Sequence, residues 1–258
     1  MTSRLRTDAL TLAYGKTDVL KEVSVALPDG QITAIVGPNG SGKTSLLRCL
    51  ARLERPTRGA AILDDSSVHK QNTRKVAQTI ALLPQSANAP AGMRVGELVA
   101  RGRTPHQSPL KQWSQEDEAA VERALSQVGL TTERERPVDA LSGGQRQRAW
   151  LAMVLAQETP ILLLDEPTTF LDLRYQLEVL TLVAQLQEEH ALTVAMVLHD
   201  INLAARFAHR ILALREGRVV ADGAPSEVVT QSGIFEIYAL NARVIPDPTT
   251  GTPHVIPA

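Results

Sequence analysis

The sequence lacks several features that would mark particular classes of protein. It has one cysteine, Cys49, among 258 residues, so no internal disulfide framework can form. Lys and Arg together number 27, and Asp and Glu number 28. This balance argues against a dedicated nucleic-acid binder, which would normally carry a basic excess. No internal repeat, heptad array or low-complexity segment is present.

Long apolar runs are also missing. Residues 1–6 (Met-Thr-Ser-Arg-Leu-Arg) lack the apolar core of a secretory signal. No apolar run approaches the ~18 residues needed to span a bilayer. We therefore expect a cytosolic protein that reaches a membrane only through a partner. Cys49 is expected to be a small buried residue of a helix.

The chain does contain a regular alternation of short apolar segments. With 43% apolar residues, it is long enough for one α/β domain with a sizeable core. Strands are predicted at 10–14, 23–27, 32–36, 60–63, 80–83, 161–164, 193–198, 211–214 and 218–221, and helices at 45–53, 95–101, 114–128, 173–189 and 201–207. Apolar strands alternating with helices indicate a mainly parallel sheet covered on both faces. The tail from residue 241 is predicted to be irregular.

Residues 37–44 fit the pattern G-x-x-x-x-G-K-[ST] of a phosphate-binding loop. A predicted strand precedes them and a predicted helix follows, so a plain glycine turn with a surface lysine is the weaker interpretation. The glycines let backbone N–H groups converge on phosphate oxygens, and the helix N-terminus adds a partial positive charge. Lys43 would reach the β- and γ-phosphates, while the Thr44 hydroxyl binds Mg²⁺. The predicted triphosphate-binding residues are Gly37, Pro38, Asn39, Gly40, Ser41, Gly42, Lys43, Thr44 and Ser45.

Two carboxylates, Asp165 and Glu166, follow the apolar run 161–164. They would stand at the carboxyl end of a strand, outside which ligands bind in open parallel sheets. Asp165 would hold Mg²⁺, directly or through water, and Glu166 could polarise an attacking water as a general base. An acidic strand end facing solvent is the alternative, and without the phosphate loop it would be the better one.

Residues 141–145 (Leu-Ser-Gly-Gly-Gln) open another predicted helix. Ser142 and Gln145 form an S-x-x-Q capping box, so taken alone they predict a capped helix start. Two consecutive glycines weaken helix propensity, which capping alone does not require. They do provide bare N–H groups at a positive helix end, and this favours a second phosphate site.

Together these motifs resemble the nucleotide-binding subunit of an ABC transporter. The resemblance runs from Tyr14 to about residue 240 and includes 161–168 (Ile-Leu-Leu-Leu-Asp-Glu-Pro-Thr). It implies an α/β fold with a P-loop NTPase core, whose RecA-like sheet is mainly parallel. An N-terminal antiparallel β sub-domain and an inserted α-helical sub-domain at about 86–157 would complete the ATPase domain, 3–240, followed by a tail, 241–258.

The resemblance also implies roles for single residues. Tyr14 matches the aromatic residue that stacks on adenine, and Gln85 matches the glutamine that senses Mg²⁺ and the γ-phosphate. Asp172 matches the aspartate that communicates across a dimer, and His199 matches the histidine that contacts the γ-phosphate. Each has a plainer alternative: Tyr14 as a strand aromatic, Gln85 as a polar loop residue, and His199 as a capping or core histidine.

The implied site uses ATP and Mg²⁺. Its catalytic residues are Glu166, His199, Gln85 and Lys43. Mg²⁺ would be held by Thr44, Gln85 and Asp165. The remaining ATP contacts beyond the phosphate loop are Tyr14, Ser142, Gly143, Gly144, Gln145 and Asp172.

Members of this family work as head-to-tail homodimers that sandwich two ATP molecules. Ser142, Gly143 and Gly144 would therefore contact ATP bound to the partner subunit's Lys43. The segment between Gln85 and Ser142 would dock against a dimeric membrane permease, and an extracytoplasmic iron-chelate-binding protein would be an indirect partner. These expectations place the protein peripherally on the cytoplasmic face of the inner membrane, with no nucleic-acid partner.

Finer matches point to one branch of the family. Residues 101–107, 169–173 and 197–206 resemble iron-chelate importers, and the tail 247–253 resembles ferric-siderophore ATPases. Thr104 departs from this pattern, because relatives often carry an aromatic there, and Leu-Asp-Asp at 63–65 replaces the usual Leu-Asp-Gly. Haem and cobalamin importers share much of the pattern and remain alternative cargo classes. His106 is expected to be a surface or permease contact rather than an iron ligand.

Two other classes compete with a transporter. A non-transport ABC ATPase would tend to carry long coiled coils, zinc clusters or tandem cassettes, which this chain lacks. A small P-loop kinase would not need the Ser142–Gly144 segment, and it would lack Glu166 as a hydrolytic base. The sequence therefore favours the transporter subunit.

Overall fold

The computed structural model describes residues 3–85, 89–108, 113–169 and 171–258. The chain divides into two compact units: unit 1 comprises Met1–Gln71 and Ala184–Ala258, and unit 2 comprises Asn72–Val183. Phe170, part of the predicted 169–173 motif, lies outside the described residues.

Unit 1 begins with an antiparallel sheet, as the resemblance implied. Its strands are β1 (Leu5–Tyr14), β2 (Thr17–Val23), β3 (Ala26–Leu27), β5 (Arg58–Leu63) and β6 (Ser66–Ser67). They follow the order β2-β1-β5-β6, and β3 also pairs with β1. The predicted single strand 23–27 is wrong, because Val25 exchanges hydrogen bonds with Thr7: the Val25 amide donates to Thr7 Oγ1, and the Thr7 amide donates to Val25 O. These side-chain and backbone bonds separate β2 from β3.

Unit 1 also holds buried parallel strands. In the order β11-β10-β4-β9, strands β10 (Arg210–Arg215), β4 (Ile32–Val36) and β9 (Thr193–Val197) run parallel, and β11 (Arg218–Gly223) forms an antiparallel hairpin with β10. Every residue of β4 and β9 is buried. That explains why both read as continuous apolar runs instead of alternating ones.

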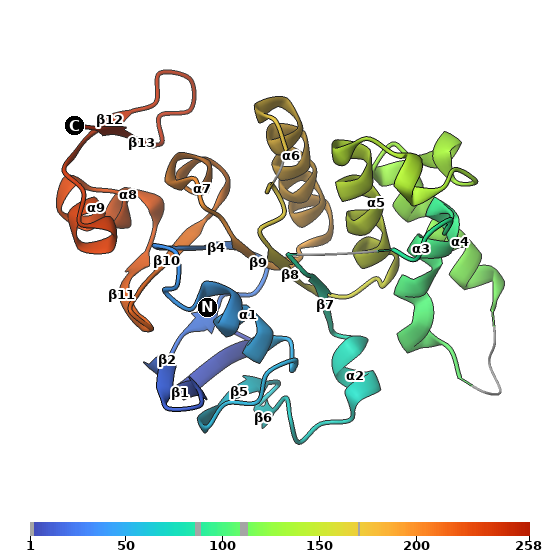
Figure 1. Ribbon diagram of the computed structural model, residues 1–258, viewed down its shortest axis with the longest axis horizontal. Coiled ribbons are helices and arrows are strands. Elements are labelled where there is room, and N and C mark those ends of the chain that lie inside the picture. The colour runs from blue at the N-terminus through green and yellow to red at the C-terminus, as the bar shows by residue number, and fades with distance from the viewer. Residues whose placement is uncertain (1–2, 86–88, 109–112, 170) are drawn as a thin grey trace. The chain divides into compact units, whose positions relative to one another are not determined.

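Helix α1 (Lys43–Leu50) lies between the antiparallel sheet and the parallel strands of unit 1 (Figure 1), and it contacts β1, β2, β5 and β9. The predicted range 45–53 is displaced: the helix starts directly after Gly42 and ends before Ala51. Beyond it the amides of Leu53 and Glu54 both donate to Arg48 O, which turns the chain.

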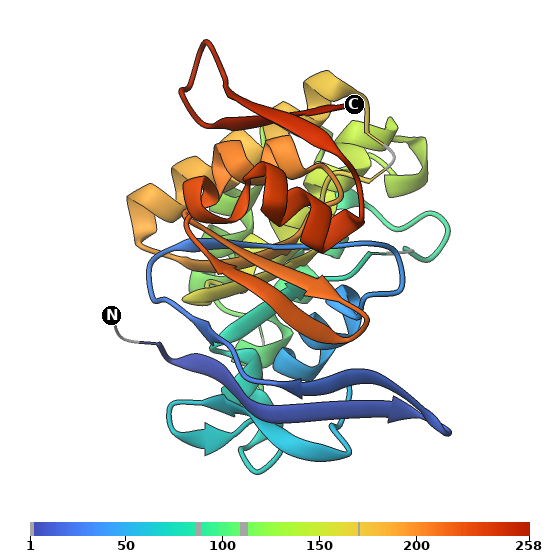
Figure 2. The same cartoon turned by 90° about the vertical axis from the view of Figure 1, so that its left-hand side faces the viewer.

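The C-terminal residues form a hairpin, so the predicted irregular tail is wrong. After α8 (Pro225–Val228) and α9 (Gln231–Tyr238), strands β12 (Ala242–Pro246) and β13 (Pro253–Pro257) pair antiparallel (Figure 2). Asn202, on α7 (Ile201–Phe207), holds β13: the Val255 amide donates to Asn202 Oδ1 at 2.7 Å, and Asn202 Nδ2 donates to Val255 O at 3.2 Å. The prolines sit at strand ends, where they remove no central ladder bond.

Unit 2 combines one parallel strand pair with a group of helices. Strands β7 (Ile80–Leu83) and β8 (Ile161–Asp165) pair in parallel. The helices are α2 (Thr73–Ala77), α3 (Val95–Ala100), η1 (Arg101–His106), α4 (Gln115–Gln127), η2 (Thr131–Glu133), η3 (Val138–Ala140) and α5 (Gly143–Ala156). Helices α3, α4 and α5 pack on one another (Figure 1), and α6 (Leu173–His190) begins in this unit. Among the described residues, no helix combines the length and apolar composition needed to cross a bilayer.

The segment η1 is fixed by a buried arginine. Arg103, 5% exposed, donates to Asp117 Oδ1 at 2.9 Å, to Ala156 O at 2.8 Å and to Glu158 Oε2 at 2.8 Å. Burial alone would raise the pKa of Asp117, but hydrogen bonds from Arg103 and Ser114 outweigh it and lower that pKa. Part of the importer-like segment 101–107 is therefore structural.

Candidate functional site

The predicted phosphate-binding loop of unit 1 follows β4 and leads into α1, as expected. Gly37, Gly40 and Gly42 all have positive φ angles of 141°, 76° and 100°. The loop is braced from outside by the β10–β11 turn, because the Gly217 amide donates to Ser41 O at 3.2 Å. The chain therefore turns at the carboxyl end of the buried strand β4 and continues into the first turn of α1.

Two loop positions require glycine for lack of space. A Cβ at Gly37 would lie 2.0 Å from Leu214 O, and a Cβ at Gly42 would lie 2.7 Å from Leu20 Cδ2. Gly42 also precedes the first residue of α1 and makes no side-chain hydrogen bond to cap it. An anion is a suitable acceptor at such a helix end.

Lys43 places a cation inside this loop. The residue is 5% exposed, and Nζ donates to the carbonyl oxygens of Gly37 and Pro38 at 2.9 Å each. Two main-chain carbonyl groups therefore hold the ammonium group inside the loop. The loop therefore offers backbone amides, a helix N-terminus and one cation to a phosphate chain.

Tyr14 and His199 lie in the same unit as the loop. Tyr14 ends β1, is 48% exposed and lies beside Ser45. Partial burial, assisted by the Glu54 carboxylate, raises the pKa of its phenol, so the ring is neutral near pH 7. His199 is exposed just beyond β9, where the Leu198 amide still donates to Ile35 O at 3.1 Å. That bond places His199 near the end of β4 from which the loop departs.

Asp165 and Glu166 lie in unit 2 and are not a solvent-facing strand end. Asp165 is the last residue of β8 and is 2% exposed, and Glu166 is 8% exposed. Glu166 has φ +53°, which is unfavourable for a residue with a side chain. Thr169 Oγ1 donates to Glu166 Oε2 at 2.9 Å. Two buried carboxylates therefore stand at the carboxyl end of this parallel strand.

The segment 142–145 forms the predicted capped helix start. The Gln145 amide donates to Ser142 Oγ at 3.3 Å, and the Ser142 amide donates to Gln145 Oε1 at 3.2 Å. Gly143 is exposed with open space around it, whereas a Cβ at Gly144 would lie 3.0 Å from the ring of Tyr175. The structure is therefore compatible with both a helix cap and a second phosphate site, because the capping bonds and an exposed glycine occur together.

Gln85 and Asp172 complete the predicted residues of unit 2. Gln85 is exposed two residues beyond the end of β7. Asp172 precedes α6 and caps it, because Asp172 Oδ1 accepts from the Tyr175 amide at 3.1 Å. Both side chains are thus at strand or helix ends, where polar groups are accessible.

The donors assigned to Mg²⁺ fit that ion chemically. Thr44 offers a hydroxyl, Gln85 an amide oxygen and Asp165 a carboxylate, and Mg²⁺ prefers oxygen ligands. Among the residues that the structure describes, no three His, Cys, Asp or Glu side chains gather as a self-sufficient metal site. Mg²⁺ typically takes one or two protein carboxylates and completes its sphere with water and substrate phosphates.

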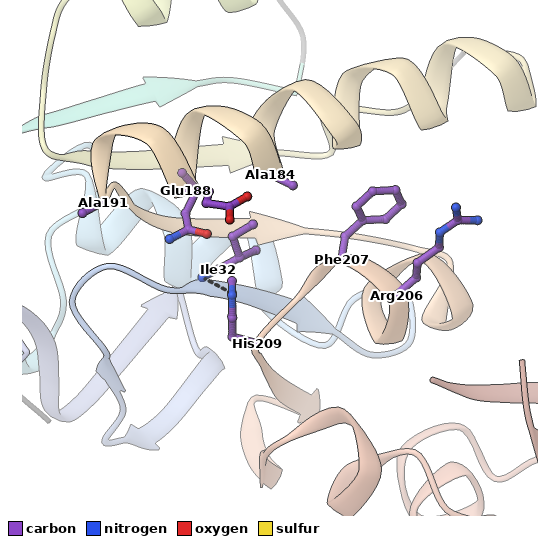
Figure 3. Close-up of a pocket in the computed structure, with 8 residues that line it drawn as sticks. Ile32, Ala184, Glu188, Ala191, Arg206, Phe207 and His209 are labelled. Atoms are coloured by element: carbon purple, nitrogen blue, oxygen red, sulfur yellow. Dashed lines mark hydrogen bonds between the residues drawn. The ribbon is translucent and has the colours of Figure 1, made fainter. Parts of the chain in front are cut away.

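A surface pocket of unit 1, of about 460 Å³, lies at the opposite end of β4 (Figure 3). Ile32 begins β4 there, and its amide donates to His209 Nδ1 at 3.1 Å. Gln187 Nε2 donates to Gly30 O at 2.8 Å. Two polar side chains of the lining are therefore already bonded to the main chain.

No role was predicted for Thr169, although it lies in the importer-like segment 169–173. A hydroxyl three residues after an acidic residue in a turn was the available signal. Tyr175, whose ring faces Gly144, was not predicted either, because residues on two different helices meet there.

Comparison with known proteins identifies a single family. A profile of the ABC transporter family matches residues 20–169. The sequence is 51% identical to the ferric enterobactin transport ATP-binding protein FepC of Escherichia coli (strain K12), over 99% of this chain and 94% of that protein. It is 49% identical to the probable siderophore transport system ATP-binding protein YusV of Bacillus subtilis (strain 168), over 99% and 93%.

A hemin import ATP-binding protein, HmuV of Rhodopseudomonas palustris (strain BisB18), is 40% identical over 100% of this chain and 96% of that protein. Among solved structures, an inward-facing protein described as an ABC transporter of the metal-chelate type matches with a TM-score of 0.86. The two are 27% identical, and the match covers 100% of this chain and 98% of that one.

Proposed function

The chain belongs to the ABC transporter family, and on that premise we propose that it is the ATP-hydrolysing subunit of a ferric-siderophore importer. The observation that supports the cargo best is the 51% identity to a ferric enterobactin subunit, against 40% to a hemin subunit. Haem or cobalamin import by the same ATPase is the second candidate, because those importers share much of the sequence pattern. A non-transport ABC ATPase is less favoured.

The phosphate-binding loop provides for ATP binding. Backbone N–H groups of 37–45, except at Pro38, and the Lys43 ammonium bind the phosphate chain, and Tyr14 stacks on the adenine. Thr44, Asp165 and Gln85 would hold Mg²⁺, which would neutralise charge on the β- and γ-phosphates.

Hydrolysis then requires a base. Glu166 accepts a proton from water as the water oxygen attacks the γ-phosphorus. The bond from that phosphorus to the β–γ bridging oxygen breaks, and ADP leaves. His199 and Gln85 contact the γ-phosphate and stabilise its charge.

The remaining predicted residues act in assembly. Ser142, Gly143, Gly144 and Gln145 bind ATP held by a second copy of this chain, and Asp172 communicates across that homodimer. We assign residues 3–240 to the ATPase domain, with a helical part at about 86–157 docking on a permease dimer, and 241–258 to a tail. The protein would then lie peripherally on the cytoplasmic face of the inner membrane, with an extracytoplasmic chelate-binding protein as an indirect partner.

Two variants of the purified full-length chain test the proposed ATP binding and hydrolysis. Glu166→Gln should still bind ATP and lose turnover, because the base is gone while the loop is intact. Lys43→Met should lose ATP affinity by about tenfold or more, since a charged phosphate contact is removed. Equilibrium binding and phosphate release measure both, and normal turnover by Glu166→Gln would refute the assigned base.

Light scattering tests the dimer. The Glu166→Gln protein, which should bind ATP without hydrolysing it, should dimerise when ATP is added, and Ser142→Arg introduced into it should block this by crowding the shared γ-phosphate. A Ser142→Arg variant that still dimerises with ATP would argue against the sandwich.

A further inference from the structure

The carboxylate assigned as the base is held by a threonine hydroxyl. Thr169 Oγ1 donates to Glu166 Oε2 at 2.9 Å, and the Thr169 amide donates to Glu166 O at 3.2 Å, closing a turn. Glu166 is 8% exposed and has φ +53°. A residue with a Cβ adopts that backbone only where its surroundings enforce it. The hydroxyl contact is therefore part of a constrained turn.

The turn is itself anchored by two glutamines. Gln147, on α5, donates from Nε2 to Pro167 O at 3.0 Å. Gln176, on α6, donates to Leu171 O at 3.1 Å. Side chains of both helices therefore donate to main-chain oxygens close to Thr169, at Pro167 and at Leu171.

We propose that Thr169 is a positioning residue for ATP hydrolysis, whose hydroxyl orients the Glu166 carboxylate toward the attacking water. The proposal rests on the proposed function, since it takes Glu166 as the base. The last torsion of a glutamate side chain is broad, so a donor to one oxygen selects among many orientations.

The effect of losing the hydroxyl follows from geometry. Displacement of a reacting group by about 1 Å can lower a rate about 100-fold. Thr169→Val keeps the β-branched shape and removes only the donor. We expect it to lower kcat for ATP hydrolysis about 10–100-fold in the full-length chain, with the KM for ATP essentially unchanged, because no ATP-binding group is altered.

Two further variants separate positioning from folding. Thr169→Ser keeps a hydroxyl and should retain most of the turnover. Thr132→Val is the matched control: Thr132 Oγ1 donates to Glu133 Oε2 at 2.8 Å, but this pair is exposed and lies outside the proposed site. That variant should keep both kcat and KM.

Glu166→Gln, measured in parallel, distinguishes the two proposals. If Glu166→Gln turns over normally, the assigned base fails and the role of Thr169 fails with it. If Glu166→Gln is inactive while Thr169→Val keeps its full kcat, only the positioning proposal is overturned. Equal losses in Thr169→Val and Thr169→Ser, accompanied by a lower Tm, would show a purely structural role and also overturn it. In the Glu166→Gln background, Thr169→Val should cause no further loss of the residual rate.

Discussion

Replacing Arg103 with methionine should destabilise the protein strongly. The guanidinium is buried with Asp117, and these side chains are 6% and 4% exposed. Arg103→Met leaves the Asp117 carboxylate buried without its cation and removes a donor to Ala156 O. Breaking a buried pair from one side costs about 3–5 kcal/mol. At ~2–4 °C per kcal/mol for a chain of this size, Tm should fall by roughly 6–20 °C.

The matched control is Arg123→Met. Arg123 donates to the same Glu158 carboxylate at 2.7 Å, but its side chain is 58% exposed. Exposed pairs contribute about 0–1 kcal/mol, so this Tm should fall by no more than about 4 °C. Differential scanning calorimetry at pH 7.5 compares the two, and equal shifts would refute the argument from burial.

Arg103→Met should also change how Tm depends on pH. The pKa of Asp117 is lowered in the folded protein, so its contribution to stability is present above the unfolded pKa of about 3.8 and is lost as pH falls through the folded pKa. Without Arg103, burial should raise that pKa instead, and the carboxyl takes up a proton more easily. The gap in Tm between Arg103→Met and the unmodified protein should therefore narrow as the pH falls from 7.5 toward the unfolded pKa of about 3.8. A constant gap would contradict the buried-charge explanation.

Three further predictions concern packing. A Cβ on Gly102 would lie 2.1 Å from Met153 O, so Gly102→Ala should lower the free energy of unfolding by about 1–3 kcal/mol in a urea titration, and an unchanged midpoint would contradict that contact. Asn202→Ala removes both hydrogen bonds to Val255 and should lower the stability of the hairpin by about 1–2 kcal/mol. Amide hydrogen exchange in 242–257 should therefore accelerate roughly 5–30-fold, and unaltered protection would mean that other contacts hold the hairpin. Burial raises the pKa of Cys49 to about 12, so at pH 8 a thiol reagent should label it only after denaturation; rapid native labelling would contradict its burial.

Local patterns predicted much of the fold. The helix predicted at 114–128, the phosphate-binding loop between β4 and α1, and the helix predicted at 201–207 all follow from neighbouring residues and are present. Such features depend on contacts a few residues apart, which a sequence displays directly. The antiparallel N-terminal sheet instead followed from the family resemblance.

The errors have a common physical cause. Thr7 splits the predicted strand 23–27, and Asn202 orders a tail whose prolines suggested irregular chain. Each contact joins residues far apart in sequence, so no local pattern reveals it. The hydrogen bond from Thr169 to Glu166 could not be predicted either, because it depends on the backbone conformation of Glu166.

The central claim is that ATP hydrolysis by this chain drives uptake of a ferric siderophore. The most direct measurement is uptake of radiolabelled ferric siderophore by cells whose only copy of the protein carries Glu166→Gln, against cells with the unmutated protein. This uptake should be lost while haem and cobalamin uptake continue. Unchanged siderophore uptake, or loss of haem or cobalamin uptake instead, would contradict it.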